Sequence, residues 1–280
     1  MEQKYKRIRK FFEQEVSHVI TVAKKYIEIF TDDDRENQKI MFMYTKVSDI
    51  YFHLSYIDLA EFYINECIAL IERLLGKAKT LPAFDSSHLA SLLFEAYANK
   101  GAVCNSKAEY SIAIKNLDES ISIGEQLLID DENLAVVHMS RSISYHALKD
   151  YATATIDAEI SVRMIDQLHY EGNLRDKNWL AMIYTNRADL YVSMMRYNEA
   201  LADYNKSIEF WEKMRKEGEV INKNHLARAY IYKDVAISKV MFKKNEKPLY
   251  EEGQKKYRRN TAKALLDLNF RKKNLGGESK

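Results

Sequence analysis

A fourfold internal repeat constrains the fold of this chain more than any other feature of its sequence. Each copy starts at a small residue and has Tyr or Cys three positions later, Ala twelve positions later, and Ser or Cys nineteen positions later. The four copies align without a gap, and an array of this kind predicts supersecondary units that stack on their neighbours. The copies run from Ser48 to Cys67, from Gly101 to Ser120, from Ser142 to Ser161 and from Ala188 to Ser207.

The composition and the apolar pattern predict that each copy is helical. Only 8 of the 280 residues are glycine and 2 are proline, which disfavours sandwiches, barrels and propellers, because these folds turn often. Apolar residues recur at intervals of three or four, as between Ile57 and Leu75, which is typical of an amphipathic helix. The small residue at the start and the alanine in the middle let two helices approach closely. Each copy is therefore predicted to be a helix hairpin.

In the spacing of small, aromatic and alanine residues, the copies resemble the tetratricopeptide repeat, and the best match is Tyr184 to Ser207. The copies start 53, 41 and 46 residues apart, which is longer than the ~34 residues usual for that repeat. The resemblance is therefore to the long-repeat variety found in kinesin light chains, mitotic-spindle adaptor proteins and bacterial peptide-pheromone receptors.

This resemblance implies an all-α, right-handed superhelical solenoid of antiparallel helix hairpins with capping helices, in a single domain over residues 1–280. Such an array needs end helices with a polar outer face. The expected parts are an N-terminal capping helix at 1–34, hairpins at 36–76, 86–129, 131–169 and 177–217, a degenerate repeat and basic C-terminal helix at 222–273, and a disordered tail at 274–280.

The resemblance also implies a binding groove, because the first helices of successive hairpins line the concave side of such a solenoid. In peptide-binding members, an Asn two positions before the small residue often binds the ligand backbone, and an amide offers both a donor and an acceptor. Asn99 and Asn186 occupy this position here, and Lys46 occupies it in the first copy. The alternative that each Asn bonds to its own helix or to water stays open. The other expected groove residues are Asp49, Asn105, His146, Asp189 and Arg228.

These features predict a non-catalytic scaffold or interaction module that binds a peptide or a partner segment. The chain has no phosphate-binding glycine motif, no zinc-protease motif and no pair of closely spaced cysteines, so no catalytic residue, metal site or cofactor is expected. The two cysteines, Cys67 and Cys104, are expected in the core of a cytoplasmic protein. No apolar stretch reaches 18 residues, so no membrane span is expected.

Two alternative functions stay open. The similarity to pheromone receptors suggests a peptide-sensing regulatory receptor that acts on a second protein. The chain ends are basic, with 11 Lys or Arg against 5 Asp or Glu in residues 244–280. A contact with an acidic surface or a nucleic acid through these ends, chiefly the basic C-terminal helix, is the second alternative.

Overall fold

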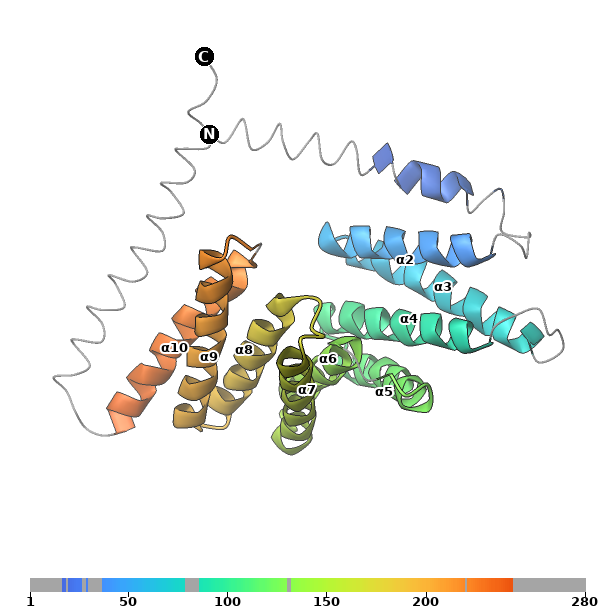
Figure 1. Cartoon of the computed structure of the whole chain (residues 1–280). Helices are drawn as coiled ribbons and strands as arrows, with labels where there is room; N and C mark the ends of the chain where they lie inside the picture. Colours follow the sequence, from blue (N-terminus) through green and yellow to red (C-terminus); the bar gives the residue numbers. More distant parts are fainter. Residues whose placement is uncertain are drawn as a thin grey trace, which may run out of the picture. The chain divides into compact units, whose positions relative to one another are not determined.

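The computed structural model describes residues 17–18, 20–26, 29, 37–78, 86–129, 132–219 and 221–243. Within these ranges all regular structure is helical, which confirms the all-α fold class (Figure 1). Of the residues expected to form the capping helix at 1–34, only ten are among those described. Of the segment expected at 222–273 to form the degenerate repeat and the basic C-terminal helix, residues 222–243 are described, and the tail expected at 274–280 lies outside the described residues. The helices are α2 (Asn37–His53), α3 (Ile57–Ala78), α4 (Ser86–Ser106), α5 (Tyr110–Gln126), α6 (Glu132–Ala147), α7 (Tyr151–Glu171), α8 (Lys177–Ser193), α9 (Tyr197–Lys216) and α10 (Lys223–Lys243).

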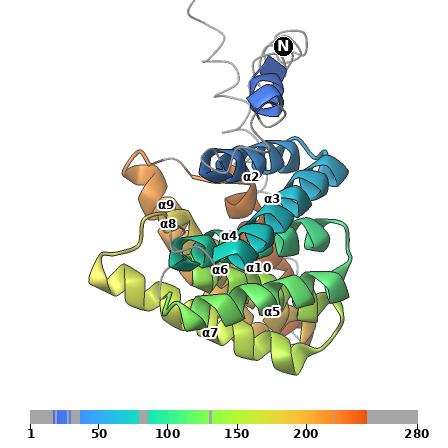
Figure 2. The same cartoon turned by 90° about the vertical axis from the view of Figure 1, so that its right-hand side faces the viewer.

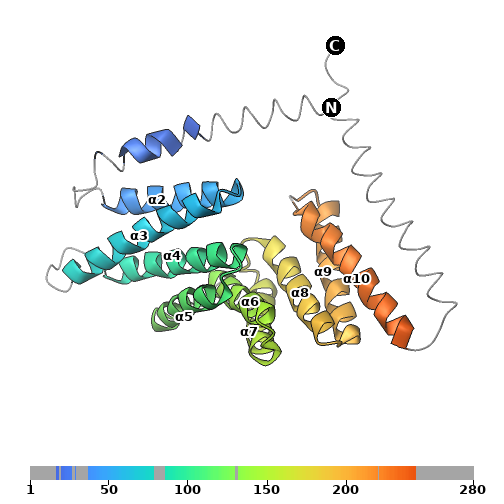
Figure 3. The ribbon, with the colours of Figure 1, turned by 180° about the vertical axis from the view of Figure 1, so that it is seen from behind.

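The chain divides into two compact units, residues 1–130 with 143–148 and residues 131–142 with 149–280. In the first unit, α3 packs against both α2 and α4, and α4 packs against α5 (Figure 2). In the second unit, α8 packs against both α7 and α9, and α10 packs against α9 and α8 (Figure 3). In each unit, then, helices that follow one another in the chain pack together, both within a hairpin, as α4 with α5 and α8 with α9, and between hairpins, as α3 with α4 and α7 with α8.

The last residue of each copy joins the two helices of its hairpin. Its side chain donates a hydrogen bond to a main-chain carbonyl 26 residues earlier, on the first helix, and all four donors are buried. Because a buried hydroxyl needs a partner, this bond explains why the repeat ends in Ser or Cys. The pairs are Cys67 with Met41 (3.7 Å), Ser120 with Phe94 (2.9 Å), Ser161 with Ala135 (2.6 Å) and Ser207 with Ala181 (2.7 Å).

The small residue that starts each copy lies where the two helices touch. A Cβ atom added to Gly101 would lie 2.5 Å from Cγ of Leu117 on the second helix. The hydroxyls of Ser48 and Ser142 instead donate to the carbonyls of Ala60 and Ala154, at 2.8 and 2.7 Å. The close helix approach predicted from the small residues is therefore confirmed.

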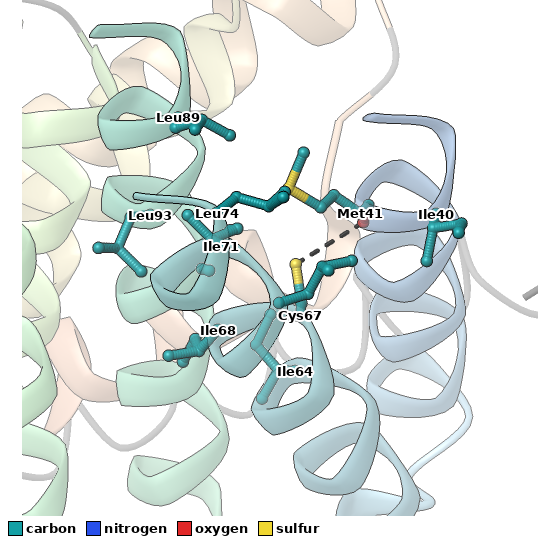
Figure 4. Packing of buried hydrophobic residues seen from close by; sticks show 11 residues of the cluster. Ile40, Met41, Ile64, Cys67, Ile68, Ile71, Leu74, Leu89 and Leu93 are labelled. Carbon is teal, nitrogen blue, oxygen red and sulfur yellow. Dashed lines mark hydrogen bonds between the residues drawn. The ribbon is translucent and has the colours of Figure 1, made fainter. Parts of the chain in front are cut away.

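Each unit has a hydrophobic core between its helices. In the first unit, one cluster of buried residues includes Met41 of α2, Ile64, Cys67 and Ile71 of α3, and Leu93 of α4 (Figure 4). In the second unit, the fully buried Trp211 is the largest side chain of a cluster formed by α8, α9 and α10. Both cysteines are free and buried, as the sequence predicts. Among the described residues, no helix is long and apolar enough to cross a membrane.

Each turn inside a hairpin holds a non-glycine residue in the left-handed backbone region. These residues lie two positions before the second helix, and in three of the four turns the next N–H bonds to the carbonyl five residues back, as in a Schellman motif. Their φ angles are 64° at Ser55, 59° at Ala108, 65° at Lys149 and 59° at Met195. A Cβ atom makes this conformation unfavourable by roughly 1 kcal/mol.

Met195→Gly is expected to raise the free energy of unfolding by about 0.5–1 kcal/mol, because glycine adopts a positive φ without this cost. The Met195 side chain is 71% exposed, so little packing is lost. Urea unfolding followed by circular dichroism measures the change. Met195→Ala is the control, because it removes the same packing and keeps the Cβ atom. An equal gain from alanine would contradict the explanation.

Candidate functional site

The eight residues expected in the groove all lie on the first helices of hairpins or on α10. Five of them belong to the first unit and three to the second. They are Lys46 and Asp49 on α2, Asn99 and Asn105 on α4, His146 on α6, Asn186 and Asp189 on α8, and Arg228 on α10.

In the first unit, three of these residues form a small polar cluster between α2 and α4. The amide nitrogen of Asn99 lies 3.5 Å from a carboxylate oxygen of Asp49. The ammonium of Lys46 lies 3.7 Å from the other oxygen and 5.4 Å from the ring centre of Phe42. Phe42 is 57% exposed. The cluster therefore presents an amide, a compensated carboxylate and an accessible aromatic ring.

Asn105, also in the first unit, is engaged by its own protein. Its side-chain oxygen accepts a hydrogen bond from the hydroxyl of Ser144, at 2.6 Å. This bond links α4 to the part of α6 that belongs to the same unit. At Asn105, therefore, the amide oxygen has a structural role, and His146 lies half-buried two residues after its partner.

In the second unit, Asp189 is the centre of a network that joins three helices. One carboxylate oxygen accepts a hydrogen bond from the hydroxyl of Tyr204 on α9, and the other accepts one from the guanidinium of Arg228 on α10. Burial and the Asp189 carboxylate together raise the pKa of Tyr204, which keeps its hydroxyl a donor. The charge of Asp189 is thus compensated within the protein, so Asp189 does not by itself select a basic ligand.

Asn186 is the expected groove residue whose hydrogen-bonding capacity is unused. Its side chain is half-buried on α8, one turn before Asp189, and makes no hydrogen bond to any residue that the structure describes. An amide in this state offers two donor hydrogens and an acceptor oxygen to a peptide group.

Sequence reasoning missed a pair of ion pairs that recur in the last two copies. Arg141 forms two hydrogen bonds with Asp157, at 2.8 and 2.7 Å, and Arg187 forms two with Asp203, at 2.7 and 2.8 Å. Both carboxylates are buried. The signal was an Arg immediately before the small residue combined with an Asp sixteen positions later.

Glu61, Cys104 and Glu109 bring three potential metal-ligand atoms within 4.8 Å of one another. The ammonium of Lys107 already lies 2.7 Å from Glu61 and 3.6 Å from Glu109. Burial, and then the nearby carboxylates, raise the pKa of the Cys104 thiol, and a thiol binds metal as the thiolate. These residues are therefore explained as an ion-pair cluster around Lys107.

One cavity, of about 540 Å³ and broadly open to solvent, lies at the surface of the second unit between α7, α8 and α9. Its walls include Arg163 and Asp166 from α7, Tyr184 and Arg187 from α8, and Lys206 from α9. None of the eight expected groove residues lines it. The basic C-terminal segment, where a contact with nucleic acid is expected, lies outside the described residues.

Comparison with known families and structures agrees with this architecture. The tetratricopeptide repeat family matches residues 181–210, which span most of α8 and the first part of α9. Residues 181–210 therefore match a tetratricopeptide repeat (TPR). A comparison with curated protein sequences gave no match.

Solved structures of similar fold cover most of this chain at low sequence identity. BtubC (BKLC) from P. vanneervenii is 13% identical with a TM-score of 0.67, over 89% of this chain and 91% of that chain. The apo form of RapI is 16% identical with a TM-score of 0.68, over 96% and 82%. A Rap protein in complex with Competence and Sporulation Factor is 13% identical with a TM-score of 0.58, over 92% and 66%. At these identities the likeness is one of fold.

Proposed function

We propose that this TPR protein is a non-catalytic interaction module that binds an extended segment of a partner protein along the first helices of its hairpins. The observation that carries the proposal is the half-buried amide of Asn186, which has unused donors and an unused acceptor beside the Asp189 and Arg228 pair. A peptide backbone presents the complementary groups at every residue.

Two further observations support an interaction module. TPR arrays present extended concave surfaces, built from several repeats, that serve for binding. The Rap protein of similar fold was solved in a complex with Competence and Sporulation Factor.

The free, buried thiols of Cys67 and Cys104 fit a reducing, cytoplasmic setting.

The test starts from peptides selected from a random library on the full chain. Asn186→Ala is expected to lower the affinity for the selected peptide about tenfold, because it removes hydrogen bonds worth roughly 1–1.5 kcal/mol from a partly buried site. Asn99→Ala is expected to have a smaller effect, because Asn99 is already near Asp49. Fluorescence anisotropy with labelled peptide gives the dissociation constants.

The matched control is Asn205→Ala, which removes the same amide from an exposed position on α9, the second helix of the same hairpin. It is expected to leave the affinity unchanged. If Asn186→Ala binds the peptide as tightly as the unmodified chain, the groove assignment is wrong.

A peptide-sensing regulatory receptor is the second candidate, and the similarity in fold to two Rap structures favours it. A receptor must change its structure when the peptide binds, whereas a scaffold need not. Small-angle scattering with and without the selected peptide separates the two. A changed radius of gyration supports the receptor, and an unchanged one supports the scaffold.

A further inference from the structure

The cavity between α7, α8 and α9 lies on the side of α8 away from the expected groove residues. Tyr184 and Arg187 line the cavity, whereas Asn186 and Asp189 are groove residues. Each cavity residue is two positions before a groove residue, and two positions rotate a helix by about 200°. The cavity is therefore a separate surface of the same unit, and a ligand there leaves the groove side of α8 free.

Each of the three helices that line the cavity contributes one cation. These are Arg163 of α7, Arg187 of α8 and Lys206 of α9. Arg163 is exposed and forms no ion pair with any residue in the described part of the chain. Arg187 uses its Nε and one Nη atom to hold Asp203, so its other Nη atom remains. Lys206 donates one hydrogen bond, to the hydroxyl of Tyr184 at 3.3 Å.

The carboxylates in the cavity do not use up these donors. The carboxylate of Asp166 accepts a hydrogen bond from the hydroxyl of Tyr184, whose oxygen lies 2.8 and 2.7 Å from the two carboxylate oxygens. Burial and Asp166 raise the pKa of Tyr184, so the tyrosine stays protonated and donating. Glu159, on the same helix, is the second carboxylate of the lining. Among the described residues neither Glu159 nor Asp166 forms an ion pair with Arg163 or Lys206, so both cations keep N–H groups for a ligand.

The aromatic residues around the cavity fit a protein partner. Tyr170, at the cavity wall, is 88% exposed. The Tyr184 ring forms the lining beneath Lys206, whose ammonium is 4.9 Å from the ring centre. Tyr and Arg are the residues most enriched, with Trp, among those that dominate protein interfaces.

We propose that this cavity is a second binding site, which takes an acidic side chain of a partner protein. The side chain is a glutamate, an aspartate or a phosphorylated serine, and its oxygens bind Arg163 and Lys206 while the neighbouring residue packs on Tyr170. Charge-assisted hydrogen bonds of this kind are stronger than neutral ones.

The experiment uses the full chain and three fluorescein-labelled peptides of tyrosine and alanine that differ only at their central residue, which is glutamate, phosphoserine or glutamine. Fluorescence anisotropy at 50 mM and 200 mM salt is expected to show binding of the glutamate peptide, the phosphoserine peptide or both. The glutamine peptide is expected to bind at least about tenfold more weakly. The stronger of the two charged peptides identifies the acidic group.

Two variants, Arg163→Gln and Lys206→Gln, are each expected to lower the affinity for the charged peptide about fivefold to tenfold. Lys216→Gln is the matched control, because it removes the same charge from an exposed residue of α9 that does not line the cavity. Asn186→Ala is expected to leave this binding unchanged, which separates this site from the groove. The proposal is overturned if the glutamine peptide binds equally well, if Lys216→Gln weakens binding as much as Lys206→Gln, or if no charged peptide binds.

Discussion

Asp157→Ala is expected to lower the free energy of unfolding at pH 7 by about 3–5 kcal/mol, because it removes the buried carboxylate that pairs with the guanidinium of Arg141. Asp157 is 1% exposed. It accepts two hydrogen bonds from Arg141, and one of its oxygens lies 2.9 Å from Nδ1 of His138. Both partners lie on α6, so the substitution also removes a link between the two helices of a hairpin.

The same contacts predict how stability depends on pH. Burial opposes ionisation of Asp157, but the hydrogen bonds from Arg141 and His138 outweigh it and hold the pKa of the carboxyl below its usual value. A carboxyl with a lowered folded-state pKa contributes stability above its unfolded value, near ~3.9, and loses that contribution as the pH falls through the folded value. The unmodified protein is therefore expected to lose more stability than Asp157→Ala below about pH 4.

Urea unfolding between pH 7 and pH 3, followed by circular dichroism, measures both effects. Asp203→Ala is the matched variant, because it removes the equivalent carboxylate, which holds Arg187 without a histidine. Its loss at pH 7 is expected to be smaller than that of Asp157→Ala. A loss of under about 1 kcal/mol for Asp157→Ala would show that Arg141 does not depend on this carboxylate.

Gly101→Ala is expected to lower the free energy of unfolding by about 1–3 kcal/mol, the range for overpacking in a core. The added methyl would lie 2.5 and 2.6 Å from the Cγ and Cδ2 atoms of Leu117, which is fully buried. Helix propensity alone favours alanine over glycine by about 1 kcal/mol. A net loss therefore means that the steric cost of pushing α4 and α5 apart exceeds this gain.

Gly76→Ala in α3 is the matched control, because an added Cβ there meets nothing within 4 Å. This substitution is expected to raise the free energy of unfolding by up to about 1 kcal/mol, because alanine has the higher helix propensity. A double-mutant cycle with Leu117→Ala adds a second check. The double variant is expected to be more stable than the sum of the single losses indicates, because the smaller side chain leaves room for the methyl. A gain for Gly101→Ala similar to that for Gly76→Ala would contradict the close contact.

The repeat register could be predicted because it follows from local rules. The intervals that place Gly101 and Ala113 in one copy are those at which two hairpin helices touch, and a small residue is needed at each contact. The final Ser or Cys also belongs to this register, although its bond to a carbonyl 26 residues earlier was not foreseen. The left-handed turn residues escaped prediction, because Ala108 and Met195 lack the glycine signal on which such predictions rest.

The candidate site could be predicted only as a set of helix faces. Sequence periodicity placed Asn186 and Asp189 on the first helix of a hairpin, where the structure has them on α8. Both side chains are polar and lie on one face of the helix. Asp189 is bound by Tyr204 and Arg228, whereas Asn186 makes no hydrogen bond to a described residue. The cavity was not foreseen, because its cations come from three helices and no motif links them.

Sequence alone was therefore enough for the helices, their pairing and the positions of closest contact, since these depend on residues at a constant interval within one copy. The partners of the charged groups required the folded arrangement. Asp189 meets Tyr204 and Arg228, which lie 15 and 39 residues further along the chain and on two other helices. Helical periodicity shows which face carries a residue, but electrostatic and hydrogen-bond partners are set by distances between helices, and these exist only once the hairpins have packed.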